Sequence, residues 1–159
     1  MKIGSAATID PITIVVDASV VIKWLIPEDD QPKALKIRDL YQEARMNVIA
    51  PGLLTAEIGN VLWKRVRSGL LGSAHADKAL FRFQQDTPVL RDSPVINATA
   101  LRLAVLHNRT FYDSLYLAVA IHHHCDLVTA DEKFVRAMEP AFPAVRLLKS
   151  YVLPPQLES

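Results

Sequence analysis

Four carboxylates in this sequence lie where an α/β fold would bring them to one edge. Asp17 ends the apolar run ITIVVD, and the other three acids are Glu57, Asp113 and Asp131. Clustered carboxylates repel one another and lose hydration, which raises their pKa values and destabilises the fold. A hard divalent cation such as Mg²⁺ or Mn²⁺ removes that penalty and keeps several waters, leaving room for a phosphate. Such a centre can polarise a phosphodiester and deprotonate a water molecule.

The elements that must position these acids follow from the apolar pattern. Residues 12–17 form a nearly uninterrupted β-branched run, which predicts a strand buried on both faces of a parallel sheet. Further strands are expected at 47–50, 89–90, 126–129 and 145–148. Helices are expected at 20–25, 32–46, 51–67, 73–86, 94–107, 111–123 and 131–139. Strands separated by helices predict a parallel sheet in an α/β sandwich.

Each acid also has an ordinary structural explanation. Asp17 and Asp131 could each cap the helix that follows, and Asp113 in a first helical turn gains from the helix dipole. Glu57 could be a solvated residue paired with Lys64 on the same helix face. Capping does not explain why all four acids lie on elements that a parallel sheet brings to one rim, where ligands bind in open α/β sheets.

Composition limits the other classes of protein. The 159 residues fit one domain, with an N-terminal lead at 1–11, a folded domain at 12–150 and a C-terminal tail at 151–159. With a net charge of +1, any nucleic-acid contact must come from a local patch. The single Cys125 favours a reducing compartment and an inert buried thiol. Because no apolar segment is long enough for a signal peptide or a membrane span, we expect a cytoplasmic protein.

Two groups of cationic or titratable residues deserve separate interpretation. The consecutive His122–His124 would point in three directions on a helix, so they cannot hold one metal together and instead suit a helix end. The run KRVR lies on the helix that carries Glu57 and is ordinarily a solvated face. Its cations Lys64, Arg65 and Arg67 are the first candidates for contacts to nucleic-acid phosphates.

Two other classes of phosphate-handling enzyme lack the residues they need here. A haloacid-dehalogenase-like phosphatase requires a second Asp two residues after the strand-end Asp, where this chain has Ser19. A P-loop enzyme requires GxxxxGK[ST], which the sequence does not contain.

The four acids stand in four motifs, which are VVDASV with Asp17, AEIGNVL with Glu57, TFYDSLYLAVA with Asp113 and LVTADEKF with Asp131. These motifs resemble those of the PIN-domain ribonucleases. In size and motif order, the chain is similar to a VapC-type toxin of a toxin–antitoxin pair. The resemblance covers about residues 12–150 and shows no departure at the four acids. It implies a PIN-like three-layer α/β/α sandwich with a central parallel sheet.

The same resemblance implies a set of roles and partners. The four acids would be catalytic and would surround one or two Mg²⁺ (or Mn²⁺) ions. Ser19, Asn60 and Thr129 match positions that support the metal ligands or contact the substrate. The implied reaction is metal-dependent hydrolysis of RNA, and the implied partners are an RNA substrate and a cognate antitoxin protein.

A homodimer is expected because the helices at 51–67 and 94–107 carry more apolar residues than one core-facing stripe needs. The surplus residues are Trp63, Leu70, Leu101, Leu103 and Val105. An antitoxin should cover the acidic site, and an Arg is the side chain best suited to enter it. The alternative from another class is a catalytically idle PIN module that only binds RNA or a protein, against which the four intact acids argue.

Overall fold

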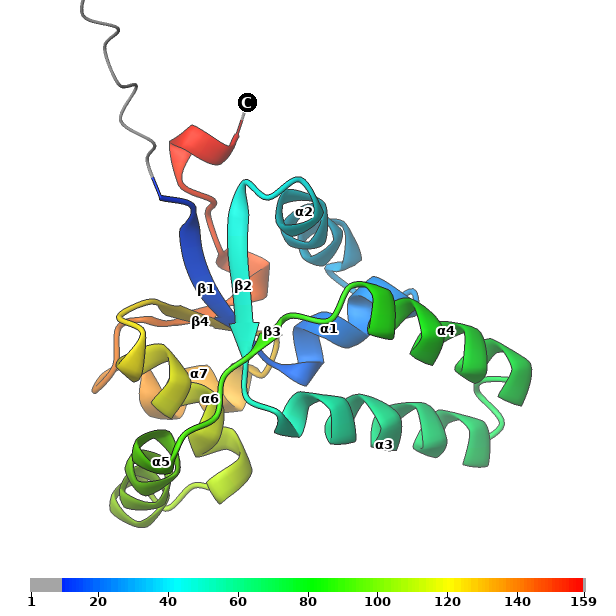
Figure 1. Cartoon of the computed structure of the whole chain (residues 1–159). Helices are drawn as coiled ribbons and strands as arrows, with labels where there is room; N and C mark the ends of the chain where they lie inside the picture. The colour runs from blue at the N-terminus through cyan, green and yellow to red at the C-terminus, as the bar shows by residue number, and fades with distance from the viewer. Residues whose placement is uncertain (1–9, 159) are drawn as a thin grey trace, which may run out of the picture.

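A central parallel sheet organises the computed structural model, which describes residues 10–158. Its strands are β1 (Ile12–Val16), β2 (Met46–Ala50), β3 (Val89–Leu90), β4 (Asp126–Thr129) and β5 (Val145–Leu147). They are all parallel and lie in the order β3-β2-β1-β4-β5 (Figure 1). The parallel sheet predicted from the sequence is therefore confirmed, and β1 and β4 are neighbours whose carboxyl ends meet.

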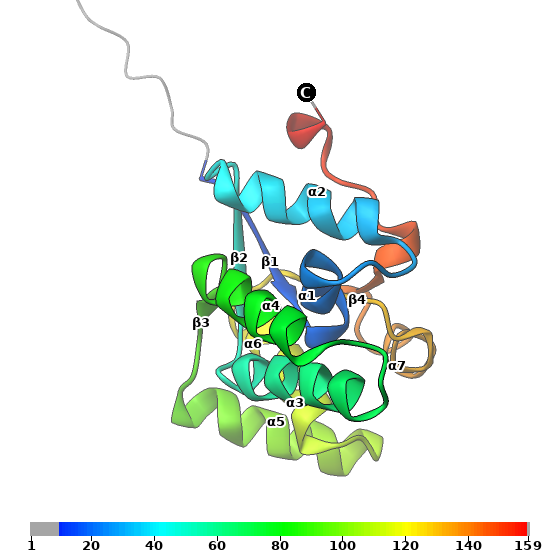
Figure 2. The same cartoon turned by 90° about the vertical axis from the view of Figure 1, so that its right-hand side faces the viewer.

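Helices cover both sides of this sheet. They are α1 (Ala18–Leu25), α2 (Gln31–Gln42), α3 (Leu53–Arg67), α4 (Ser73–Gln85), α5 (Pro94–His107), α6 (Phe111–His122) and α7 (Glu132–Met138). Figure 1 shows α1–α4 on one side of the sheet and α5 and α6 on the other. The helices α3 and α4 form a hairpin that extends away from the sheet, and α1 packs against both of them (Figure 2).

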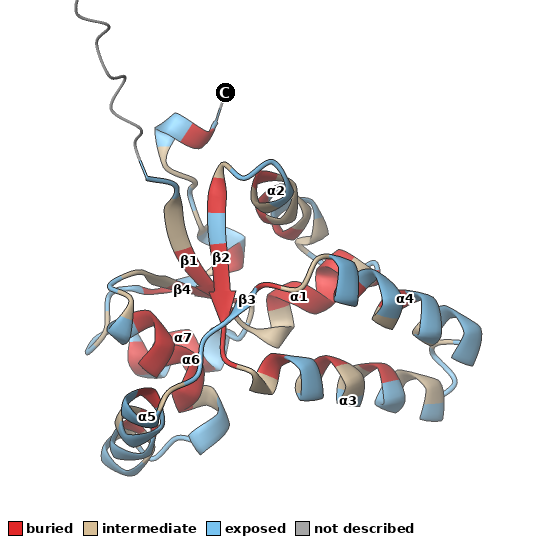
Figure 3. Ribbon diagram, viewed as in Figure 1, coloured by how far each residue is buried: buried red, intermediate tan, exposed pale blue. Residues whose placement is uncertain are grey.

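The core lies where the strands meet α1 and α6. Residues 14–16 of β1 are buried, and α6 is buried continuously from Ser114 to Ala120, as its apolar sequence predicts (Figure 3). The outward turns of α3, α4 and α5 are exposed. Within the described residues, no helix combines the length and apolar content that crossing a bilayer requires.

Three predicted helix limits differ from the structure by two residues or more. α1 begins at Ala18, two residues earlier than predicted, because the carboxylate of Asp17 caps it. α2 ends at Gln42, four residues earlier, since Ala44 adopts a left-handed conformation with φ of 55° that reverses the chain into β2. α3 begins at Leu53 instead of 51.

The described part of the predicted C-terminal tail is folded against the domain. Apart from Asp10 and Pro11, the predicted N-terminal lead at 1–11 lies outside the described residues, as does Ser159. The tail at 151–158 packs back on the domain, and Leu157 in the short 3₁₀ helix Pro155–Leu157 is buried.

Candidate active site

The four sequence-predicted acids line one cavity at the carboxyl ends of β1 and β4. Its volume is about 180 Å³, and its walls are Asp17, Ala18, Ser19, Glu57, Asp113, Tyr116, Leu127, Asp131 and Phe134. The acids come from four places: the end of β1, α3, the first turn of α6 and the start of α7. Topology thus brings together carboxylates that are up to 114 residues apart in the sequence, from 17 to 131.

Asp17 is both a helix cap and a wall of this cavity. Its Oδ1 accepts hydrogen bonds from the backbone N–H groups of Ser19 at 3.0 Å and Val20 at 3.3 Å, which fixes the start of α1. The capping explanation for Asp17 is therefore correct, and it does not compete with the functional one.

Two hydroxyl groups hold the Asp17 carboxylate from the other side. Thr129 Oγ1 donates to Asp17 Oδ2 at 2.5 Å and accepts the Asp131 N–H at 3.1 Å. Ser19 Oγ donates to Asp17 Oδ1 and accepts the Ala130 N–H at 2.8 Å. Each hydroxyl has one proton and donates it to Asp17. Its lone pairs are therefore left to accept the backbone N–H groups of the β4–α7 turn. Ser19 and Thr129 thus position Asp17 and fasten the turn that carries Asp131.

The electrostatics of the cavity favour a positive ligand. Burial raises the pKa of Asp17 to about 6, with the charge of Glu57 adding to the rise and the hydroxyls of Ser19 and Thr129 opposing it. The pKa of Glu57 is also raised, first by burial and further by the nearby Asp113, while its hydrogen bond from Tyr116 lowers it. The protein therefore compensates the negative charge in this cavity only in part.

Glu57 is held by a residue that the sequence analysis did not identify. The hydroxyl of Tyr116 on α6 donates a hydrogen bond to Glu57 Oε2, so the expected alternative pairing of Glu57 with Lys64 is wrong. Burial and the charge of Glu57 raise the pKa of Tyr116 well above its usual range, while the backbone amide of Ala18 opposes this rise. Three residues after Asp113, Tyr116 lies one turn along the same helix, and this spacing was the available signal.

The remaining two acids differ in their local bonds. Asp131 caps α7 through Oδ1, which accepts the N–H groups of Lys133 at 2.9 Å and Phe134 at 3.0 Å. Its Oδ2 makes no hydrogen bond within residues 10–158. Asp113 does not cap α6, because the Thr110 hydroxyl performs that role by accepting the Asp113 N–H at 3.0 Å.

The base of α3 is fixed by a second residue that sequence reasoning missed. Asp92, which follows β3, accepts the N–H of Gly52 at 3.0 Å and so satisfies the helix start. A Cβ at position 52 would lie 2.5 Å from Asp92 Oδ2, so a larger residue there would displace the Asp92 carboxylate from this bond. Through this bond, the segment that follows β3 fixes the start of α3, the helix that carries Glu57.

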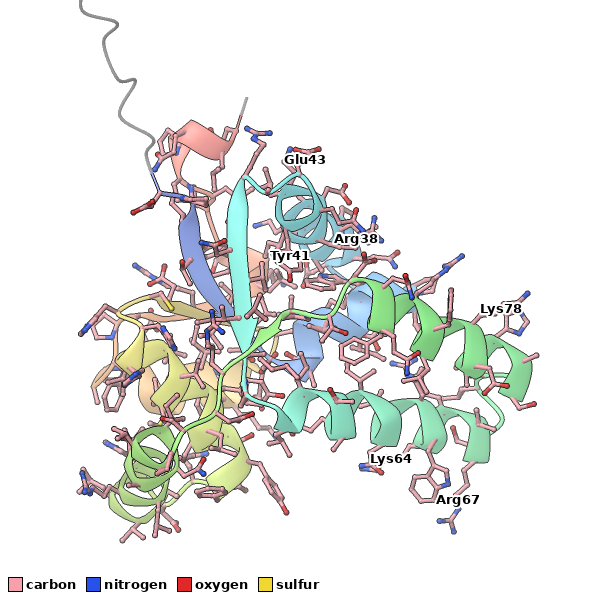
Figure 4. The ribbon with its side chains drawn as sticks, in the orientation of Figure 1. Arg38, Tyr41, Glu43, Lys64, Arg67 and Lys78 are labelled. Carbon is pink, nitrogen blue, oxygen red and sulfur yellow. The ribbon has the colours of Figure 1, made fainter. Side chains whose placement is uncertain are left out.

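The other sequence-predicted residues lie further along α3. Asn60 and Lys64 are exposed on the helix outside the cavity. Arg65 bonds to Glu28, whereas Arg67 lies over the Trp63 ring with its guanidinium carbon 5.4 Å from the ring centroid. Figure 4 shows Lys64 and Arg67 on the side of the hairpin opposite Lys78.

The donor set fits a hard divalent cation. All four acidic side chains offer only oxygen ligands, as Mg²⁺ and Mn²⁺ prefer. Across the described part of the chain, no three His, Cys, Asp or Glu side chains are spaced to hold an ion by themselves. Mg²⁺ is usually bound through one or two protein carboxylates and completes its shell with water, so a group of three protein ligands is not required.

Cys125 and the histidines lie away from this cavity. Burial raises the pKa of the Cys125 thiol to about 11, so it stays protonated and unreactive, as expected. His122 ends α6, and the rings of His122 and His123 are edge-on with centroids 5.1 Å apart.

Comparison with known proteins agrees with this geometry. The family model of the PIN domain matches residues 14–139, which include the carboxyl end of β1, every residue that lines the cavity, and α7. The chain belongs to the PIN-domain family. Ribonuclease VapC1 from Mycobacterium tuberculosis is 33% identical over 132 residues, covering 81% of this chain and 92% of the relative. Ribonuclease VapC3 from Pyrobaculum aerophilum is 31% identical over 135 residues, covering 83% and 96%.

Solved structures share the PIN fold. The crystal structure of PAE2754 from Pyrobaculum aerophilum superposes with a TM-score of 0.65 at 26% identity and covers 88% of this chain and 93% of that one. A toxin–antitoxin complex from Klebsiella pneumoniae contains a chain with a TM-score of 0.57 at 15% identity, which demonstrates a common fold. That alignment covers 88% of this chain and 99% of the other.

Proposed function

We propose that this PIN-domain protein is a Mg²⁺-dependent endoribonuclease and the toxin of a type II toxin–antitoxin pair. The observation that carries the proposal is the convergence of Asp17, Glu57, Asp113 and Asp131 on one cavity. The relatives named VapC ribonucleases support the substrate class. The raised pKa values of Asp17 and Glu57 support a cation at the centre.

The chain's own residues would hold and orient the reacting groups. Asp17 is fixed by Ser19 and Thr129, and Asp131 has Oδ2 free of its capping bonds. Asp113 and Glu57 face the same space from two other elements. Mg²⁺ or Mn²⁺ held by these carboxylates would supply a Lewis acid for the phosphodiester and lower the pKa of an attacking water.

RNA would approach along α3. Glu57, Asn60 and Lys64 follow one another at helical spacing, so the face that begins in the cavity continues to an exposed cation. Arg67 and the half-exposed Trp63 beside it add a second cation and an aromatic face, which together suit single-stranded nucleic acid. Arg65 is engaged with Glu28 and would contribute less.

The antitoxin and dimer parts of the proposal rest on exposed apolar side chains. Trp63, Leu70, Leu101 and Val105 are all more than half exposed, between 53% and 78%. Leu103 belongs to the buried core, so that part of the expectation for the dimer was wrong. Light scattering should give a dimer mass at micromolar concentration, and a monomer mass would overturn this part of the proposal.

The activity is tested with purified protein freed of any partner. Wild type should cleave RNA with Mg²⁺ or Mn²⁺ and stop with EDTA. A circular RNA substrate distinguishes internal cleavage from end-directed cleavage, a distinction that matters because one relative, 36% identical over 92 residues, is named Exonuclease VapC9. Asp113→Asn should abolish cleavage, and Asp77→Asn, an exposed acid on α4, should not. RNA binding without cleavage under all these conditions would favour the idle PIN module.

Expression in bacteria tests the toxin role separately. Wild type should arrest growth, and co-expression of a cognate antitoxin should restore it. Growth arrest that persists with Asp17→Asn would show that toxicity has another cause.

A further inference from the structure

Tyr116 occupies an unusual place in the cavity. It lies within the buried stretch of α6, where its neighbours Leu115 and Leu117 are apolar, and only 3% of its surface is exposed. Buried tyrosine hydroxyls need a hydrogen-bond partner. The partner here is a carboxylate on a different helix, Glu57 on α3.

This contact differs from the other hydroxyl contacts to the acids. Ser19 lies in the first turn of the helix that Asp17 caps, and Thr129 ends β4, the strand that pairs with β1, so both contacts are made where two neighbouring strands end. Tyr116 instead joins the core helix α6 to the base of the projecting hairpin.

We propose that Tyr116 is a positioning residue that fixes the Glu57 carboxylate for cation binding. This inference rests on the proposed metal-dependent function. The hydroxyl has one proton and gives it to Oε2, while Oε1 accepts no hydrogen bond within the described part of the chain. One carboxylate oxygen is thus anchored and the other remains available to the cavity. Without the phenol, the Glu57 side chain regains rotamer freedom that cation binding must remove again.

α6 then performs two roles on one face. Asp113 provides a carboxylate directly, and Tyr116, one turn later, orients a second carboxylate from α3. Partners that orient metal ligands typically change metal affinity or activity by about 10- to 100-fold when removed. A tyrosine that served only to fill the core would act through its ring, which phenylalanine retains.

The test compares Tyr116→Phe with two matched variants of the same helix. Ser114→Ala removes a buried hydroxyl that has no hydrogen-bond partner, and Tyr112→Phe removes an exposed phenol next to Asp113. Calorimetric titration of the metal-free proteins with Mn²⁺ is the primary measurement. We expect Tyr116→Phe to weaken Mn²⁺ binding about 10-fold and both controls to bind like wild type. Equal binding by Tyr116→Phe and wild type would overturn the inference.

A double-mutant cycle asks whether Tyr116 acts through Glu57. In a Glu57→Gln background, Tyr116→Phe should change the Mn²⁺ affinity less than about twofold, because the carboxylate that it orients is gone. A full 10-fold loss in that background would also overturn the inference. Failure of wild type itself to bind Mn²⁺ would instead contradict the proposed function, so the two failures are distinguishable.

A measurement on wild type covers the case in which Tyr116→Phe does not fold. Of the four tyrosines, only Tyr116 bonds to an acid of the cavity. In wild type labelled with ¹³Cζ-tyrosine, Mg²⁺ should shift the Tyr116 resonance and leave the resonances of Tyr41 and Tyr151 unchanged. An unshifted Tyr116 resonance under saturating Mg²⁺ would contradict the inference.

Discussion

The acidic cavity and the α3–α4 hairpin use polar residues in opposite ways. In the cavity, Asp17 receives two hydroxyl and two backbone hydrogen bonds, so its geometry is fixed from several sides. On the hairpin, Lys64 and Arg67 are exposed and oriented mainly by the helix that carries them. Catalysis requires carboxylates that are held in one arrangement, whereas mobile cations are sufficient to bind a flexible polymer such as RNA. The difference predicts that cavity changes alter turnover and hairpin changes alter affinity.

The largest expected effect is the loss of turnover on removing one cavity charge. Asp113→Asn keeps the shape of the side chain but removes a carboxylate that makes no capping bond to α6. Activity should fall by at least about 100-fold, at or beyond the upper end of what loss of a supporting partner costs. Single-turnover cleavage at saturating RNA measures this directly. A loss confined to RNA affinity would place Asp113 with the hairpin residues instead.

The attachment of the hairpin to the domain depends on a small ionic cluster. Glu28 accepts the ammonium of Lys23 at 3.0 Å and also pairs with Arg65 of α3. Only 9% of the Lys23 side chain is exposed, so removing its partner leaves a charge with little access to water. We expect Glu28→Gln to lower the free energy of unfolding by about 2 kcal/mol.

Urea denaturation with Glu43→Gln as a control measures that loss. Glu43 pairs with Arg45 at 3.3 Å, and because its side chain is 56% exposed, its loss should change stability little. Equal stabilities of the two variants would show that the hairpin is held by apolar packing alone.

The hairpin cations should affect RNA binding without affecting catalysis. Replacing Lys64 and Arg67 together by Ala should raise KM several-fold and leave kcat at saturating RNA unchanged. It should also reduce the slope of log Kd against log salt by about 1.4 for two phosphate contacts to a single strand. Lys78→Ala, on the opposite side of the same hairpin, is the matched control (Figure 4). An unchanged salt slope would move the RNA path to another surface.

Local sequence signals predicted most of the fold and the convergence of the four acids on one cavity. β-branched runs and capping residues act through neighbours in the chain, so the elements predicted from them agree with the structure to within a few residues. The premature end of α2 was not predicted because Ala44 gives no signal for a left-handed conformation.

Contacts between distant elements were harder to predict from the sequence. Tyr116 in an apolar helix suggests a core residue, and its bond to Glu57 emerges only when α3 and α6 are adjacent. Arg65 was interpreted as a solvated cation because its partner Glu28 lies 37 residues away. Each of these two contacts, which the sequence did not predict, joins a polar side chain to a partner on a separate element.

The smallest expected effect is on the stability of the metal-free fold, and it follows from the buried charge of Asp17. Its folded-state pKa of about 6 lies above the ordinary 3.8, so the ionised form destabilises the fold. That cost is absent below pH 3.8 and fully present above about 6, so this group lowers stability as pH rises through the interval.

Asp17→Asn should therefore stabilise the protein at pH 7 in EDTA by on the order of 1 kcal/mol, about 2–4 °C in Tm. The Thr129 hydroxyl can turn a lone pair toward the new amide, which limits the loss of hydrogen bonding. The variant should also lack this contribution to the pH dependence between 4 and 6, and Mg²⁺ should raise its Tm less than that of wild type. Thermal melts at several pH values, with EDTA and with Mg²⁺, measure all three effects. If Asp17 served only as the cap of α1, Asn would be a near-neutral replacement at every pH and Mg²⁺ would leave both Tm values unchanged.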